Sequence, residues 1–312
     1  MKLAIVFPGQ GSQAVGMMNG WGDHPIVRAT FDEASDALGQ DLWALVADGP
    51  AEDLNLTTNT QPVMLTAGVA AWRAWLAAGG SRPVLLAGHS LGEYTALVAA
   101  GAMAFRDAVP LVRYRAQAMQ DAVPAGVGAM AAIMGAPDDE SVIAACAEAA
   151  QRQVVEAVNF NAPGQLVIAG HREAVERAVA VARTKGAKRG VMLPVSAPFH
   201  SSLLRPAAER LAARLAEVTI AATTIPVLHN VDVLTHATPD EIRHALAQQA
   251  AHPVRWTATM QAMGAQGITQ VVECGPGKVL AGLAKRSVEG VQAYSLTDGE
   301  ALAATLAELA AR

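Results

Sequence analysis

Short apolar runs alternate with longer amphipathic stretches along this chain. Residues 2–7 and 84–88 are almost entirely apolar, which is typical of strands that are buried on both faces. Residues 26–38 and 61–76 instead repeat their apolar positions with helical spacing. Short buried strands separated by long helices favour a mostly parallel sheet with helices on both sides. The pattern therefore predicts an α/β fold.

The middle of the chain has a different rhythm. Its predicted elements, in chain order, are a strand at 129–134, a helix at 138–151, strands at 154–160 and 165–169, a helix at 171–185 and a strand at 190–195. The sequence Asn161-Ala162-Pro163-Gly164 is a strong turn signal between the second and third of these strands. The order βαββαβ is that of a ferredoxin-like unit. We therefore expect a small ferredoxin-like subdomain at residues 126–196.

This small unit interrupts a larger one. We expect residues 1–125 and 197–312 to form one discontinuous α/β-hydrolase-like catalytic domain, whose mostly parallel sheet is completed after the insertion. In its second segment the pattern predicts a helix at 201–217, a strand at 226–233 and a strand-turn-helix unit at 271–286.

The strand at residues 84–88 leads directly into Gly88-His89-Ser90-Leu91-Gly92 and then into a helical stretch. A Gly-x-Ser-x-Gly sequence between a strand and a helix is typical of a nucleophile elbow, a sharp turn that exposes the serine hydroxyl. Gly88 and Gly92 lack the side chains that would collide in such a turn. The backbone N–H of Leu91, at the positive end of the helix, is placed to stabilise a developing oxyanion. We therefore predict that Ser90 is a catalytic nucleophile.

A serine nucleophile needs a base, and eight histidines compete for that role. His89 adjoins Ser90 in the sequence, so we expect its side chain to point away from the hydroxyl. His200 lies between the last strand of the small unit and a long helix, a junction that faces the cleft between the domains. His200 is therefore the histidine whose position singles it out as a candidate base, and its position alone leaves a purely structural role open. The other histidines lie in loops, on helices or in a predicted strand: His24, His171, His229, His236, His244 and His252.

Arg115 falls on an apolar stripe of a predicted helix at about residues 107–121. Ala108, Val112 and Met119 repeat with helical spacing, and Arg115 lies among them. A buried arginine requires an anionic partner, because an unpaired buried charge is costly. That partner is either an internal carboxylate or a carboxylate on the substrate, and the pattern leaves both open.

Composition narrows the class of protein. The 312 residues are 52% apolar and 16% charged, which indicates a compact globular chain, and the net charge of −5 argues against nucleic acid as the main partner. Cys146 and Cys274 are far apart and form no Cys-x-x-Cys sequence, which favours a reducing cytoplasmic setting. We find no signal-peptide pattern and no run approaching the ~20 apolar residues of a membrane span. No His, Cys, Asp and Glu cluster has metal-ligand spacing, so we expect no metal.

Several segments together resemble the malonyl-CoA:acyl-carrier-protein transacylases of fatty-acid synthesis. In chain order they are Gly9-Gln10-Gly11-Ser12-Gln13, Gly88-His89-Ser90-Leu91-Gly92-Glu93, Arg115, Phe199-His200 and Gly275-Pro276-Gly277. The resemblance runs from the first strand to about Arg286, and that family also has an inserted ferredoxin-like domain. It implies no cofactor, since malonyl-CoA is itself a substrate.

The resemblance implies a catalytic role for three matching residues. Ser90 would attack the thioester of malonyl-CoA and carry the malonyl group as an ester. His200 would take the serine proton and later deprotonate the incoming thiol. The backbone carbonyl of Gln249 would orient the histidine, with the neighbouring Gln248 as the alternative assignment.

Four further residues would contact the substrate, on the same resemblance. Arg115 would pair with the free malonyl carboxylate. Gln10 and Leu91 would supply the N–H groups of the oxyanion hole. Phe199 resembles the residue of malonyl-selective members, in which a large ring leaves little space for an α-methyl group.

The second implied substrate is an acyl carrier protein, an acidic protein that bears a phosphopantetheine thiol. A net-acidic enzyme must meet it with a local positive surface. The candidates are basic residues near the last strand of the small unit and after the glycine turn: Lys185, Lys188, Arg189, Lys285 and Arg286. We expect a monomer, because no long exposed apolar stripe is evident.

Three other functions stay open on the sequence. An α/β-hydrolase shares the Gly-x-Ser-x-Gly signature, but it places an Asp or Glu between serine and histidine in chain order. An acyltransferase of polyketide synthesis, or the malonyl-transferring subunit of malonate decarboxylase, would use the same chemistry in another pathway. A non-catalytic acyl-binding or scaffold protein is the third, and the joint presence of Ser90, His200 and Arg115 argues against it.

Overall fold

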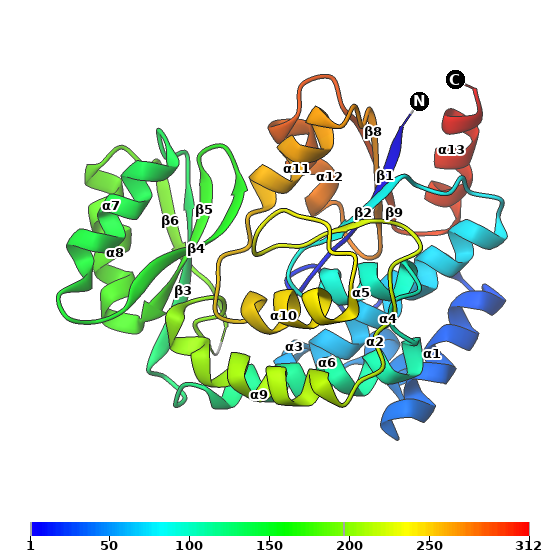
Figure 1. Cartoon of the computed structure of the whole chain (residues 1–312), viewed down its shortest axis with the longest axis horizontal. Coiled ribbons are helices and arrows are strands. Elements are labelled where there is room, and N and C mark those ends of the chain that lie inside the picture. Colours follow the sequence, from blue (N-terminus) through cyan, green and yellow to red (C-terminus); the bar gives the residue numbers. More distant parts are fainter. Residues whose placement is uncertain (1, 196, 312) are drawn as a thin grey trace.

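The computed structural model describes residues 2–195 and 197–311 and contains two separate sheets (Figure 1). The larger sheet has the strand order β7-β2-β1-β8-β9, and all of its described pairings are parallel. Its strands are β1 (Leu3–Phe7), β2 (Leu85–Gly88), β7 (Val227–Leu228), β8 (Gln270–Cys274) and β9 (Gln292–Leu296). The prediction of a parallel sheet in an α/β fold is confirmed.

Helices cover both faces of this sheet, as the strand β1 illustrates. Its side chains alternate between the faces. Leu3, Ile5 and Phe7 join one apolar cluster with α4 (Thr57–Ala77) and α5 (Gly92–Ala99). Ala4 and Val6 join another with α11 (Trp256–Ala265) and α12 (Val279–Ser287). The helices around the large sheet are α1 (Pro25–Leu38), α2 (Leu42–Asp48), α3 (Ala51–Asn55), α4 (Thr57–Ala77), α5 (Gly92–Ala99), α6 (Phe105–Asp121), α9 (Arg205–Ala216), α10 (Pro239–Gln249), α11 (Trp256–Ala265), α12 (Val279–Ser287) and α13 (Gly299–Ala310), with 3-10 turns at Asn19–Trp21 and Ser202–Leu204.

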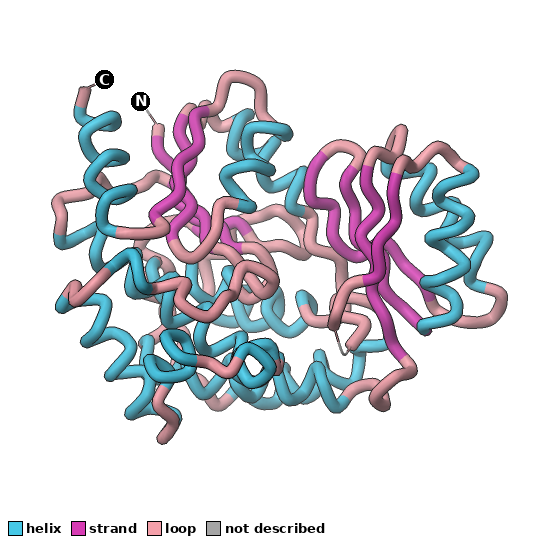
Figure 2. Tube along the Cα trace, turned by 180° about the vertical axis from the view of Figure 1, so that it is seen from behind, coloured by secondary structure: helices cyan, strands magenta, loops and turns pink. Residues whose placement is uncertain are grey.

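The second sheet is antiparallel and lies beside the first. Its strand order is β4-β5-β3-β6, and its strands are β3 (Gly128–Met134), β4 (Val155–Ala162), β5 (Gln165–His171) and β6 (Arg189–Met192). Two helices, α7 (Asp139–Ala150) and α8 (Arg172–Thr184), pack on the outer face of this sheet (Figure 2). Together with the sheet they enclose a separate apolar cluster. Met130 and Val158 on the other face belong to the main cluster. Ser196, where the predicted small unit ends, lies outside the described residues.

Several predicted boundaries were wrong. The strand expected at 226–233 is only Val227–Leu228, because the chain then turns and His229 and Asn230 bond to buried groups. The strand β4 continues to Ala162, so its turn is the tighter Pro163-Gly164. The last strand of the small sheet is Arg189–Met192 and not 190–195, and the helix expected at 201–217 is a 3-10 turn followed by α9.

The register of the large sheet fixes where a site can form. Phe7 of β1 pairs with Gly88 of β2, so the loops after these two parallel strands begin side by side. Ligands of open α/β sheets bind in this position, at the carboxyl ends of the strands. A Cβ on Gly9 would lie 2.5 Å from the backbone oxygen of His89, which shows how closely the two loops pack.

Candidate functional site

The turn after β2 places Ser90 at the carboxyl edge of the parallel sheet. Ser90 has φ of 51°, in the left-handed region that residues other than glycine rarely adopt. Glycine is required on both sides of this turn. A Cβ on Gly88 would lie 1.8 Å from the carbonyl carbon of Gly92, and a Cβ on Gly92 would lie 2.1 Å from the oxygen of Phe7. The strand, sharp turn and helix that the motif predicts are present.

Ser90 and His200 are brought into contact. Ser90 Oγ lies 2.7 Å from His200 Nε2, and His200 Nδ1 lies 2.8 Å from the backbone oxygen of Gln249. Because a carbonyl oxygen only accepts hydrogen bonds, Nδ1 carries the proton and Nε2 is free to accept the proton of the serine. The backbone oxygen of Gln248 instead accepts from His252, so Gln249 is the glutamine in contact with His200.

The environment keeps the imidazole of His200 neutral. The side chain is 3% exposed, and burial, together with the nearby Arg115 guanidinium, lowers its pKa from 6.5 to about 3. A neutral imidazole can accept a proton without first losing one. Among the described residues no carboxylate bonds to His200. The position that the acid of a hydrolase triad would occupy, beside Nδ1, is taken by the backbone oxygen of Gln249.

Arg115 projects from α6 into the same site and is 1% exposed. Its Nη1 donates to Gln61 Oε1 at 2.8 Å, and its Nη2 donates to Gln249 Oε1 at 2.8 Å and to Ser90 Oγ at 3.1 Å. All three acceptors are neutral, and no described Asp or Glu forms an ion pair with Arg115. The internal salt bridge considered from the sequence was therefore wrong. Burial lowers the pKa of the guanidinium, while the nearby Tyr94 and Glu93 act in the opposite direction. Because a buried cation is costly, a ligand with a carboxylate would be favoured at this position.

A cavity of about 110 Å³ lies beside the Ser90 hydroxyl, between the edge of the parallel sheet and the antiparallel sheet. Its wall contains the three remaining predicted substrate contacts, Gln10, Leu91 and Phe199. The backbone N–H groups of Gln10 and Leu91 donate to no other described residue. The full lining is Gln10, Gln61, His89, Ser90, Leu91, Arg115, Met119, Met130, Asn159, Leu193, Val195, Phe199 and His200.

The predicted basic residues do not line this cavity. Lys188, Arg189, Lys285 and Arg286 are exposed, the first two at β6 and the other two at the end of α12. Arg286 bonds to Gln165 and to the backbone oxygen of Pro163 at 3.2 Å, and so joins α12 to the hairpin of the second sheet. Lys185 is paired with Glu148 at 2.9 Å.

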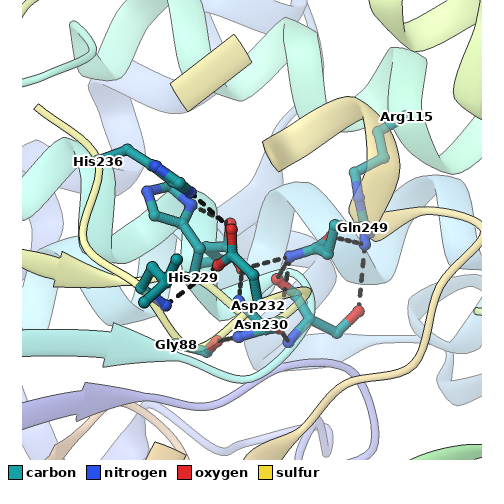
Figure 3. Close-up of polar contacts among 10 residues, drawn as sticks. Gly88, Arg115, His229, Asn230, Asp232, His236 and Gln249 are labelled. Carbon is teal, nitrogen blue, oxygen red and sulfur yellow. Dashed lines mark hydrogen bonds and ion pairs between the residues drawn. The ribbon is translucent and has the colours of Figure 1, made fainter. Parts of the chain in front are cut away.

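One buried polar cluster was missed by the sequence analysis. Glu93 is completely buried in the first turn of α5 and bonds to His229 and to the backbone N–H of Asn230. The Asn230 side chain in turn bonds to the backbone of Gly88 and Ser90 (Figure 3). A signal was present, because Glu93 is the one charged residue in the otherwise uncharged stretch from Gly92 to Ala99.

Two classes of protein receive no support from the described residues. No described helix is both long enough and apolar enough to cross a membrane. No group of three or more His, Cys, Asp or Glu side chains in the described ranges is arranged to hold a metal ion.

An elbow serine paired with a histidine on this fold is typical of acyl transfer, and the comparisons with known proteins agree. The model of the acyl transferase domain family matches residues 4–302. The chain belongs to this family, and it is therefore an acyltransferase.

Among individual proteins, the chain is similar to the malonyl CoA-acyl carrier protein transacylase of Escherichia coli (strain K12). The two are 56% identical over 306 residues, which cover 98% of this chain and 99% of that protein. The transacylase of the same name from Bacillus subtilis (strain 168) is 42% identical over 96% of this chain and 95% of its own.

Solved structures give the same picture. The acyl-carrier-protein S-malonyltransferase of Burkholderia pseudomallei 1710b superposes with a TM-score of 0.96 at 60% identity, over 98% of this chain and 100% of that one. A malonyl-transacylase in complex with its type II PKS acyl-carrier protein superposes with a TM-score of 0.97 at 50% identity, over 99% of this chain and 100% of that one.

Proposed function

We propose that this acyltransferase moves the malonyl group of malonyl-CoA to the phosphopantetheine thiol of an acyl carrier protein, and so supplies fatty-acid synthesis. The observation that carries the proposal is the buried guanidinium of Arg115, 3.1 Å from Ser90 Oγ, which forms no direct ion pair with a described carboxylate. A short acyl group that ends in a carboxylate supplies a direct anionic partner, and the planar guanidinium suits a carboxylate. The names of the relatives point to the same acyl group.

In the first half of the proposed reaction, Ser90 Oγ attacks the thioester carbonyl while its proton moves to His200 Nε2. The N–H groups of Gln10 and Leu91 stabilise the oxyanion. The C–S bond then breaks, the proton of His200 goes to the departing CoA sulfur, and a malonyl ester remains on Ser90.

The second half repeats these steps with a different thiol. CoA leaves, and the carrier thiol gives its proton to His200 as its sulfur attacks the ester carbonyl. The C–O bond breaks, Ser90 recovers the proton, and malonyl leaves on the carrier. This is a ping-pong scheme, and it needs no cofactor because one thioester is exchanged for another of similar energy. Phe199, in the cavity wall, restricts the space for an α-methyl group.

The domain division belongs to the same proposal. We assign residues 126–196 to a ferredoxin-like subdomain and residues 1–125 and 197–312 to the catalytic domain. The separate antiparallel sheet, with α7 and α8 on one face, supports this division.

We further propose that the enzyme works as a cytoplasmic monomer. The exposed Lys188, Arg189, Lys285 and Arg286 would meet the acidic carrier.

Intact-mass measurement tests the proposal directly. The protein is mixed with malonyl-CoA, with and without an acyl carrier protein, and Ser90→Ala is the control. A malonyl adduct that is absent from the control and moves to the carrier is the expected result. An adduct lost to water at the same rate with or without carrier would indicate a hydrolase, and no adduct would indicate a binding protein.

A further inference from the structure

Glu93 collects hydrogen-bond donors from two distant segments of the chain. Its Oε1 lies 2.7 Å from His229 Nδ1, and its Oε2 accepts from the Asn230 backbone N–H and from Gln249 Nε2, both at 2.9 Å. His229 and Asn230 follow β7, and Gln249 ends α10. The carboxylate therefore fastens both segments to the helix that follows the nucleophile.

Asn230 and Gln249, the two residues held by Glu93 Oε2, together bond to all three of the proposed functional groups. Asn230 Oδ1 accepts from the Ser90 N–H and its Nδ2 donates to the oxygen of Gly88, both at 2.8 Å, so it clamps the strained turn from both sides. Gln249 Oε1 accepts from Arg115 Nη2 at 2.8 Å, and its backbone oxygen accepts from His200 Nδ1 at 2.8 Å. Figure 3 shows Gln249 between Arg115 and Asn230.

We propose that Glu93 is a positioning residue, which fixes Gln249 and Asn230 and through them orients Ser90, His200 and Arg115. The proposal rests on the proposed function, which assigns Ser90, His200 and Arg115 as the groups that act on the acyl thioester. Gln249 Nε2 donates to Glu93 Oε2 and to the backbone oxygen of Ser90, both at 2.9 Å, so the amide oxygen of Gln249 faces Arg115. Loss of Glu93 removes one of these two acceptors and weakens the preference of the amide for this orientation. A reversed amide would present N–H groups to the guanidinium, which has only donors.

His229 holds the carboxylate from the opposite side. It is completely buried, and its ring lies 4.9 Å from that of His236, which bonds to Asp232 at 2.8 Å. Glu93 does not line the cavity, so it acts only through the residues it holds. Loss of its acceptor oxygens should therefore slow the chemistry of molecules that are still folded.

The test compares three variants of the full chain. Glu93→Leu keeps most of the volume and removes the acceptors. Glu93→Gln keeps one oxygen for the two N–H groups, and its amide nitrogen can face His229 if that ring takes the other tautomer. Glu273→Leu is the matched control, because Glu273 is also completely buried and accepts from the Ala281 N–H at 2.8 Å, but lies outside the cavity wall.

The measurement is rapid-quench intact mass with malonyl-CoA, which separates the fraction of molecules that become acylated from the rate constant of acylation. A purely structural role lowers the fraction and leaves the rate constant. For Glu93→Leu we expect a rate constant lower by about 100-fold, the loss typical of a misplaced reacting group. Glu93→Gln should keep most of the rate, and Glu273→Leu should keep the wild-type rate constant. The preference for malonyl over acetyl should also fall in Glu93→Leu, because Arg115 loses its fixed acceptor.

Equal rate constants in Glu93→Leu and Glu273→Leu would overturn the proposal. If Glu93→Leu does not fold, His229→Leu takes its place, and a wild-type rate constant in that variant would also overturn it. Failure of the proposed function is seen separately, because the wild-type protein would then form no malonyl adduct or would not pass it to the carrier.

Discussion

At the scale of single residues, Arg115 and His200 influence each other. The guanidinium is the second cause, after burial, of the low pKa of the imidazole. A substrate carboxylate that pairs with Arg115 offsets its charge, so we expect the pKa of His200 to rise when an acidic acyl group binds. The base would then be strongest with the acyl group that the site is proposed to accept.

Replacing Arg115 by alanine should separate malonyl from acetyl transfer. Breaking a buried ion pair costs about 3–5 kcal/mol, so kcat/KM for malonyl-CoA should fall by about 100-fold or more. Transfer of acetyl, which has no carboxylate, should be kept or increase. Steady-state kinetics with both thioesters measure this, and Arg113→Ala on the same helix, outside the cavity wall, is the control. An equal loss of both activities would contradict the assigned role.

His200 should also make the stability of the protein depend on pH. Its pKa is lowered from 6.5 to about 3 by folding, so below pH 6.5 the unfolded chain binds a proton that the folded protein does not. The free energy of unfolding contributed by the neutral imidazole is therefore present above pH 6.5 and is lost as the pH falls toward 3. Each pH unit in that window costs about 1.4 kcal/mol.

Urea unfolding of wild type and His200→Gln at pH 7.5 and pH 5 checks this pH effect. The wild type should lose about 2 kcal/mol more than the variant between the two values. The pKa of His89 is also lowered, mainly by burial. Because His89 is present in both proteins, its contribution to the pH dependence cancels in the comparison. Parallel pH profiles of the two proteins would show that His200 titrates normally.

At the scale of elements, the nucleophile turn depends on the close contact between the start of α5 and β1. Gly92→Ala would place a Cβ 2.1 Å from the Phe7 oxygen, a clash that can be relieved only by a shift of the backbone. We expect a loss of about 1–3 kcal/mol in unfolding free energy, as in overpacked cores, together with slower acylation of Ser90. Gly282→Ala is the matched control, since Gly282 lies within α12 and no described residue beyond its own helical turns lies within 4 Å of its added Cβ. That variant should be as stable as the wild type or up to about 1 kcal/mol more stable. Similar effects of the two substitutions, measured by urea unfolding, would argue against a tight turn.

Elements with a strong local pattern were predictable from the sequence, and elements set by distant contacts were not. The strand β1, the strand-turn-helix around Ser90 and the position of Arg115 on α6 follow from apolar spacing over short windows. The end of β7 does not, because His229 and Asn230 are held by Glu93, 136 and 137 residues away. For the same reason the sequence identified Ser90 and Arg115 as site residues but not their contacts with Gln61, Asn230 and the Gln249 side chain.

At the scale of the whole molecule, the cavity depends on two sheets that meet beside Ser90. The second sheet contributes Met130 and Asn159 to its wall. That sheet is tied to the large unit by His89 with Asn161 at 2.8 Å and by Glu156 with Ser202 at 2.7 Å. A carrier protein that delivers its thiol to this cavity would therefore meet both units, and the proposed docking residues are divided between them, at β6 and at the end of α12.

Charge reversal at β6 should impair only the second half of the reaction. In the double variant Lys188→Glu and Arg189→Glu, acylation by malonyl-CoA should be unchanged, because neither residue lines the cavity. Transfer to the carrier should slow by about 10-fold or more at low salt, since electrostatic steering raises association rates by 10–1,000-fold. Arg286 is unsuitable for this test because it also holds the hairpin of the second sheet.

Lys2→Glu with Arg82→Glu makes the same change in net charge at the amino ends of β1 and β2, the opposite edge of the parallel sheet. Single-turnover transfer from malonyl-enzyme to carrier, measured at low and high salt, distinguishes a local from a general effect of charge. If the carrier docks at β6, only the Lys188→Glu, Arg189→Glu variant loses transfer rate, and this loss becomes smaller as salt screens the interaction. Equal losses in the two pairs would mean that the carrier responds to the overall charge of the enzyme, and the basic residues of β6 would then have no special part in docking.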